Sequence, residues 1–106
     1  MKFVTVTGSL YELDLTGRKI RRLEGKGSPT PRQGKDGEWK DYVAVSIPCV
    51  GSPLLVTWRV DAEDGTTWFR MTATSKILSI DEVTEEDNIH LTQMALSLGE
   101  SKEMIA

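Results

Sequence analysis

The sequence predicts a mainly β protein, a small barrel or sandwich of about six or seven antiparallel strands with a C-terminal α-helix. Short segments alternate apolar and polar side chains, as half-buried strands do. Turn-forming pairs recur between these segments, namely Gly8-Ser9, Thr16-Gly17 and Asp64-Gly65. The pattern then becomes helical near the end of the chain. We therefore expect a β domain over residues 1–82, with a long loop at 25–38, and a helical tail over residues 83–106 packed on it.

The chain is 106 residues long, which is enough for one domain with a modest hydrophobic core. Its formal charge of −3 is unevenly distributed. Residues 1–42 carry nine Lys and Arg against six Asp and Glu, whereas residues 43–106 carry four against ten. The first part of the chain is therefore expected to suit an anionic ligand, although the whole protein is acidic.

A single cysteine and the absence of long apolar runs indicate the compartment. Cys49 has no second cysteine for an intramolecular disulfide, and it is expected to be a small buried hydrophobe between Pro48 and Val50. No run approaches the roughly 20 apolar residues of a membrane span, and the first residues form a strand pattern rather than a signal peptide. We expect a soluble protein of a reducing cytoplasm, with no membrane partner.

The first 24 residues predict a three-stranded meander over 2–7, 10–15 and 18–23. The third strand has charged side chains on both faces, from Arg18 to Arg22. One interpretation is an edge strand, whose Lys and Arg prevent pairing with other chains. The alternative is a basic patch that binds the phosphates of a nucleic acid. The absence of interleaved aromatic residues favours the edge strand, because single-strand binders need them.

Further strand patterns follow the long loop, at residues 39–47, 54–60, 66–74 and 77–80. The segment 54–60 is apolar, β-branched and contains Trp58, so it is the best candidate for a central strand. Asp64-Gly65 predicts the hairpin turn that follows it.

The tail resembles the start of a helix. Thr84 can cap its first turn, with Asp87 three residues later. One apolar stripe follows at helical spacing, formed by Leu91, Met94, Ala95 and Leu98, and Gly99 is expected to interrupt or end the helix. The stripe is expected to dock on the sheet, and the alternative is a partner or homodimer contact.

The loop at 25–39 holds four of the nine glycines and two of the four prolines. A loop this long is more often functional than a plain connector. Its spacing fits neither a Walker loop nor a dinucleotide fingerprint. Its glycine N–H groups and cations nevertheless suit anion capture, and the alternative is a stiff surface loop. The expected binding residues are Lys26, Arg32, Lys35 and Trp39, with electrostatic support from Arg18, Arg21 and Arg22.

Catalytic and metal-binding signatures are scarce. One His and one Cys cannot form the usual four-ligand zinc site, and the acidic turn at 61–65 lacks the spacing of a calcium loop. His90 is expected to be a solvated surface residue rather than a catalytic base. The acids between Asp81 and Asp87 are expected to be exposed. We expect a protein that is not an enzyme and has no cofactor and no metal.

Three segments carry a resemblance to known proteins: residues 7–14, the triplet Arg21-Arg22-Leu23, and the block Pro29-Thr30-Pro31-Arg32-Gln33-Gly34-Lys35-Asp36-Gly37-Glu38-Trp39. Together with Trp58 and Thr74-Ser75, this pattern resembles a group of small uncharacterised accessory proteins of actinobacterial phages. The likeness covers residues 4–80 and is most specific in the 29–39 block. It implies a phage product in the host bacterial cytoplasm, or a minor virion component, and it supplies no catalytic residues.

These observations together predict a non-catalytic bacteriophage accessory protein that acts by binding. Its expected partner is a host or phage macromolecule, or a small anionic ligand, engaged through loop 25–39. One alternative is nucleic-acid binding through the basic strand at 18–22. Another is a minor structural protein of the virion, with a homo-oligomer formed through the C-terminal helix.

Overall fold

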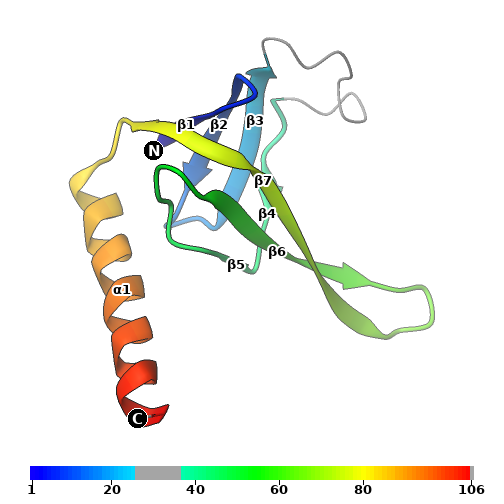
Figure 1. Cartoon of the computed structure of the whole chain (residues 1–106). Coiled ribbons are helices and arrows are strands. Elements are labelled where there is room, and N and C mark those ends of the chain that lie inside the picture. The colour runs from blue at the N-terminus through cyan, green and yellow to red at the C-terminus, as the bar shows by residue number, and fades with distance from the viewer. Residues whose placement is uncertain (26–36, 106) are drawn as a thin grey trace.

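The computed structural model describes the backbone of residues 1–25 and 37–105, and the side chains of residues 1–23 and 37–97. Seven antiparallel strands form one sheet that curls into a half-barrel, and a single helix follows it (Figure 1). The predicted class, a mainly β protein with a C-terminal helix, is confirmed.

The strands lie in the sheet in the order β4-β3-β2-β1-β7-β6-β5. Each strand pairs antiparallel with its neighbours. The elements are β1 (Lys2–Thr5), β2 (Ser9–Asp14), β3 (Lys19–Gly25), β4 (Lys40–Asp41), β5 (Ala44–Val45), β6 (Pro53–Asp61), β7 (Thr67–Asp81) and α1 (Glu85–Ile105).

The predicted meander of the first three strands is confirmed. Its first turn closes where the N–H of Gly8 donates to the carbonyl of Thr5 at 2.9 Å, with Gly8 at a φ of 86°. In the second turn the left-handed residue is Arg18, with a φ of 53°, while the N–H of Gly17 donates to Asp14 Oδ1 at 2.9 Å. The third strand is not the edge strand that one interpretation expected, because β4 lies outside it and pairs with it at Lys19 and Ile20.

The predicted single strand at 39–47 is wrong. The structure has two short strands there, β4 and β5, which lie at opposite edges of the sheet. The chain crosses between the edges at Tyr42, whose side chain is buried in the core. Its N–H donates to the carbonyl of Arg18 at 3.0 Å, and its hydroxyl donates to the carbonyl of Asp14 at 3.3 Å. These bonds hold the corner that the alternating pattern did not reveal.

The second half of the sheet is a long hairpin. Its turn lies at Asp64-Gly65 as predicted, with Gly65 at a φ of 86°. The segments expected at 66–74 and 77–80 are one continuous 15-residue strand, β7. The predicted central strand, β6, lies next to the edge strand β5. Residues 58–74, which we call the arm, extend beyond the half-barrel as a ribbon of two strands (Figure 1).

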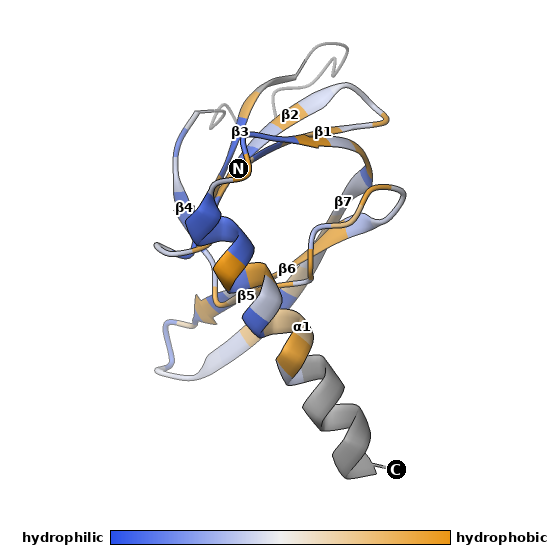
Figure 2. Cartoon of the chain, turned by 90° about the vertical axis from the view of Figure 1, so that its left-hand side faces the viewer, coloured by the Kyte–Doolittle hydropathy of each residue, from blue (hydrophilic) through white to orange (hydrophobic). Residues whose placement is uncertain are grey.

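Eight side chains make up the buried hydrophobic core of the described residues: Phe3, Leu13, Leu15, Ile20, Tyr42, Leu54, Val56 and Ile77. They come from the half-barrel and none comes from the part of β7 that lies in the arm. The radius of gyration is 15.1 Å, against about 13 Å for a compact domain of this length. The excess reflects the arm and the helix, which both project from a small core (Figures 1 and 2).

Helix α1 begins with the predicted capping box. The N–H of Asp87 donates to Thr84 Oγ1 at 3.1 Å, and the N–H of Thr84 donates to Asp87 Oδ2 at 3.0 Å. The helix contacts the half-barrel through its first turns, where Glu86 and His90 lie against Thr16. Beyond these turns it leaves the sheet (Figures 1 and 2).

The predicted apolar stripe docks only in part. Leu91 is half-buried and packs on the core, whereas Ala95 is exposed and the side chain of Leu98 lies outside the described residues. Gly99 does not end the helix, which continues to Ile105. No helix within the described ranges is long and apolar enough to cross a membrane.

Candidate functional site

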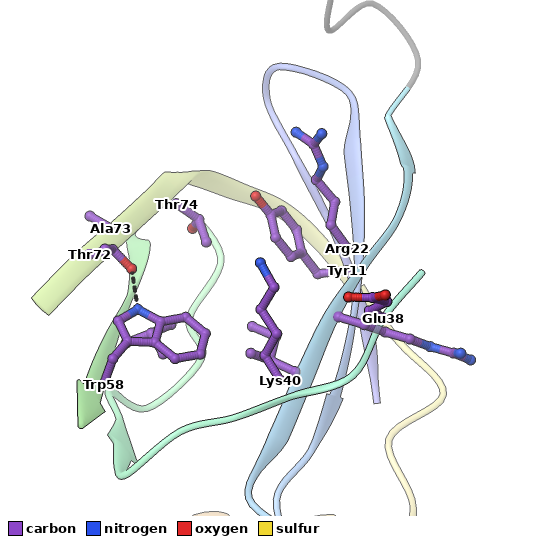
Figure 3. Close-up of a pocket in the computed structure, with 11 residues that line it drawn as sticks. Tyr11, Arg22, Glu38, Lys40, Trp58, Thr72, Ala73 and Thr74 are labelled. Atoms are coloured by element: carbon purple, nitrogen blue, oxygen red, sulfur yellow. Dashed lines mark hydrogen bonds between the residues drawn. The ribbon is translucent and has the colours of Figure 1, made fainter. Parts of the chain in front are cut away.

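The concave face of the half-barrel contains a cavity of about 140 Å³ (Figure 3). Both halves of the sheet line it, so it exists only because the sheet curls. Its lining residues are Tyr11 from β2; Ile20, Arg21 and Arg22 from β3; Glu38 and Lys40 at β4; Val56 and Trp58 from β6; and Thr72, Ala73 and Thr74 from β7.

One wall of the cavity is positively charged. Arg21, Arg22 and Lys40 contribute three cations against the single carboxylate of Glu38. In Figure 3 the Lys40 ammonium group points into the space between Tyr11 and Trp58. An anion in this space would therefore meet a flexible point charge beside two aromatic rings.

Arg21 is fixed by two neighbours. Its Nε donates to Glu12 Oε1 at 2.6 Å, and its guanidinium lies 4.4 Å from the centre of the Trp39 ring. The first contact neutralises much of its charge, and the second is a cation–π contact. Arg21 therefore holds Trp39 and contributes less to the field of the cavity than Lys40 does.

The opposite wall is aromatic and hydroxylated. The indole Nε1 of Trp58 donates to Thr72 Oγ1 at 2.8 Å, which fixes the indole against β7 (Figure 3). Because Thr72 accepts this bond, its own hydroxyl hydrogen can still be donated to a ligand. On the charged side of the cavity, Tyr11 lies beside Arg22 in the neighbouring strand and is held by stacking on Phe3, with ring centroids 5.0 Å apart and planes at 11°. The site thus offers preset ring surfaces and a hydroxyl donor.

The volume limits what can enter. A cavity of about 150 Å³ lined by apolar side chains holds a benzene ring, so a site of about 140 Å³ accommodates one flat ring or one phosphate-sized anion. Because cations and aromatic rings share the lining, the site suits a small ligand that carries a negative charge and an apolar or planar portion.

The structure brings some of the predicted binding residues together. Arg21 and Arg22 line the cavity, whereas Trp39 contacts Arg21 and is not among the lining residues. Arg18 is exposed in the turn between β2 and β3 and does not line the cavity. The other predicted binding residues, Lys26, Arg32 and Lys35, lie outside the described residues, as does most of the predicted loop.

Sequence reasoning missed Lys40, Tyr11, Trp58 and Thr72. Each lies on a strand that was predicted, but no local pattern links strands that are distant in sequence. Within the third strand no aromatic residue lies between the charged residues, which by itself disfavours binding of a single strand. In the structure the aromatic side chains beside those charges come instead from β2 and β6.

Other polar groups lie away from the cavity. Cys49 is exposed, so the expectation of a buried thiol is wrong. His90 is half-buried at the base of α1, with Nε2 3.3 Å from Thr16 Oγ1. In the tip turn of the arm, hydrogen bonds from Thr66 hold the pKa of Asp64 below its usual value. Within the described parts of the chain, no group of three or more acidic, His or Cys side chains is placed to hold a metal ion.

Asp87 differs from the expectation that the acids between 81 and 87 are exposed, because it is buried. Burial opposes its ionisation, but hydrogen bonds from Thr84 and the charge of the Met1 ammonium group, 3.4 Å away, outweigh that effect. The pKa of Asp87 is therefore lowered, and the carboxylate has a structural role in joining the helix to β1.

No family model matches the chain, and neither a curated protein nor a solved structure is significantly similar to it. The geometry of the cavity therefore carries the functional argument by itself.

Proposed function

We propose that this protein acts by binding and that its ligand is a small anion with a planar portion, held in the concave cavity. The observation that supports this proposal most is the placement of Lys40 and Arg22 in the same lining as Tyr11 and Trp58. The setting we propose is the bacterial cytoplasm during phage infection, in line with the resemblance of residues 4–80 to phage accessory proteins.

The electrostatics favour an anion even though the protein is acidic overall. The cations converge on a concave surface, where low-dielectric walls reduce screening by solvent. The acids of the second half lie mainly in the arm tip and at the start of α1, away from the cavity. The local field, rather than the net charge of −3, therefore governs recognition.

Binding is favoured over catalysis by the residue types at the site. Among the described lining residues there is no Ser, Cys or His. The common catalytic pair of Ser or Cys with His is therefore not formed by this set. The hydroxyls of Thr72 and Thr74 are instead engaged in fixing Trp58 and the backbone of β6.

Single-stranded nucleic acid is the second candidate. The specific observation is that aromatic rings and cations share the concave face, the combination with which sequence-tolerant single-strand binders hold bases and phosphates. One base would occupy the cavity, and the neighbouring phosphates would lie along β3 and β4. In this proposal a small anion and a nucleic acid bind through the same residues of the cavity.

Fluorescence titration tests the proposal, because Trp58 lines the site. The probes are inorganic phosphate, a nucleoside monophosphate and an oligothymidylate of about 12 nucleotides. We expect Lys40→Gln and Arg22→Gln each to weaken binding about ten-fold, as expected for loss of a charge-assisted contact. Lys2→Gln is the matched control, because Lys2 lies on β1, outside the cavity, and should leave binding unchanged.

Salt dependence separates the two candidates. Binding of the oligonucleotide should weaken steeply as salt rises if several phosphates are contacted, whereas a single anion gives a shallow dependence. The variants Arg32→Gln and Lys35→Gln measure the share of loop 25–39. If none of the three probes binds, or if Lys40→Gln binds as well as Lys2→Gln, the cavity is not the ligand site.

A further inference from the structure

The arm is an unusual feature for a chain with so small a core. Three large apolar side chains near its middle are exposed to solvent: Trp68 at 47%, Phe69 at 61% and Met71 at 62%. Phe69 and Met71 lie on one face of β7 and Trp68 on the other, because side chains alternate along a strand. Both faces of the ribbon therefore expose apolar surface, which is a feature of interaction sites.

The edges of the arm are open as well. On one side β7 pairs with β6 from Thr67 to Lys76, but on the other side β1 begins to pair only at Ile77. Within the described residues, the β7 edge from Thr67 to Thr74 has no strand beside it. This edge contains no Pro and no Lys, and Arg70 is its one charged residue, so it carries little of the protection that usually blocks an open edge.

The charges of the arm run from one end to the other. The tip turn carries Asp61, Glu63 and Asp64, all exposed, of which Asp61 is paired with Arg59 at 3.1 Å. Arg70 lies in mid-strand, and the base of the β7 edge carries Lys76. Two such arms placed side by side in opposite directions would match acidic tip to basic base at both ends. A surface that is complementary to itself when reversed is the requirement for a two-fold symmetric contact.

We infer that the arm is a dimerisation element, and that its occupant is the arm of a second copy of this chain. The two β7 edges pair antiparallel about a two-fold axis at Met71. In this register Met71 faces Met71 of the second copy, Phe69 faces Ala73, and Lys76 lies beside the tip turn. The two hairpins become one four-stranded sheet, which covers both open edges and joins the apolar faces.

The position of the arm permits this arrangement. It projects from the half-barrel on the side opposite α1, so neither the helix nor the first three strands stands in its way (Figure 1). Isolated two-stranded hairpins are at best marginally stable in water, whereas a sheet of four strands is stabilised by its neighbours. The inference does not rest on the ligand proposed above. Trp58 and Thr72 to Thr74, at the base of the arm, line the cavity, but the contact is argued from the open edge and is centred on Met71, which does not line it.

Sedimentation equilibrium of the full chain tests the inference directly. We expect the protein to be a dimer at a concentration of about 100 µM, in the range of a weak but specific contact. Met71→Lys should raise the dimer dissociation constant about ten-fold or more, because two like charges then face one another across the axis. Leu78→Lys is the matched control, since Leu78 is also on β7 and 58% exposed, but lies where β1 already covers the edge.

Cysteine crosslinking tests the register without depending on charge. In a Cys49→Ser background, Met71→Cys places two thiols at directly opposed positions, with Cβ atoms about 4.5–5.5 Å apart, and oxidation with diamide should link the chains. Phe69→Cys in the same background places the thiols about 13 Å apart and should not. A monomeric wild-type protein, or crosslinking of Phe69→Cys as complete as that of Met71→Cys, overturns the inference.

Discussion

Ionisation of Tyr42 should destabilise the folded protein at high pH. Burial raises the pKa of Tyr42 from 10.0 to about 12, with the carboxylate of Asp14 adding to the effect and Arg18 opposing it. The unfolded chain therefore releases the phenolic proton about two pH units earlier than the folded chain. Stability linked to Tyr42 is fully present below pH 10 and is lost as the pH rises toward the folded-state pKa.

The size of the effect follows from the two pKa values. At pH 11 the ratio of the two ionisation equilibria gives a loss of about 1.4 kcal/mol, against less than about 0.1 kcal/mol at pH 9. The full difference, reached above pH 12, is about 2.7 kcal/mol. Tyr42→Phe removes this linkage and keeps the ring in the core. It should cost about 0.5–1 kcal/mol at pH 8, because the hydrogen bond to the Asp14 carbonyl is lost.

Urea unfolding of both proteins at pH 8, 9, 10 and 11 measures the prediction. Wild type should be the more stable protein at pH 9, and its advantage in free energy of unfolding over Tyr42→Phe should fall by about 1.3 kcal/mol between pH 9 and pH 11. Because the hydroxyl bond contributes about 0.5–1 kcal/mol, Tyr42→Phe should be the more stable protein at pH 11. Other groups titrate over the same range, but they do so in both proteins and cancel. If the free energy of unfolding changes with pH in the same way in the two proteins, Tyr42 is not buried at the corner between β4 and β5.

Three further predictions concern α1 and Trp39. Thr84→Ala should reduce stability by about 1 kcal/mol and lower the helical circular dichroism signal, because the cap bond to Asp87 is lost. The lowered pKa of Asp87 stabilises the fold above its unfolded value of 3.8, and this contribution is lost as the pH falls through the folded pKa. Asp87→Asn should therefore make acid unfolding less steep, and an unchanged acid limb would contradict the proposed role. Arg21→Met should increase quenching of Trp39 by acrylamide and cost about 1 kcal/mol or less, since the ion pair with Glu12 is partly exposed. Glu12→Gln breaks only the ion pair. If it increases the quenching of Trp39 as much as Arg21→Met does, the protection of Trp39 depends on the ion pair rather than on the cation–π contact.

Local features of the fold were predictable from the sequence because local chemistry decides them. The alternation in residues 10–15 predicts β2, Asp64-Gly65 predicts the arm turn, and Thr84 with Asp87 predicts the start of α1. Each of these depends on side chains within a few residues of one another. The number and type of elements could therefore be anticipated.

Features that depend on curvature could not be predicted in this way. Residues 39–47 alternate as one strand would, yet Tyr42 is drawn into the core and separates β4 from β5. Strand β7 continues through Ser75 and Lys76 because two different neighbours pair with its two halves. The cavity has the same origin: Lys40 and Trp58 line one space only when the sheet curls. Neither the hydrophobic periodicity nor the residue spacing within one segment predicts how the sheet curls.

The link between β4 and β5 has a mechanical consequence. The two edges of the sheet are joined by Tyr42 and Val43 alone, and the peptide units from Asp41 to Ala44 span at most about 10 Å. The half-barrel therefore cannot flatten without breaking its own edge pairing. A ligand that draws Lys40 inward pulls on β5, which pairs with β6 at Val56 and Thr57, just before the arm begins. Lys40 on β4 and the residues of β6 just before the arm are thus connected through one short length of backbone.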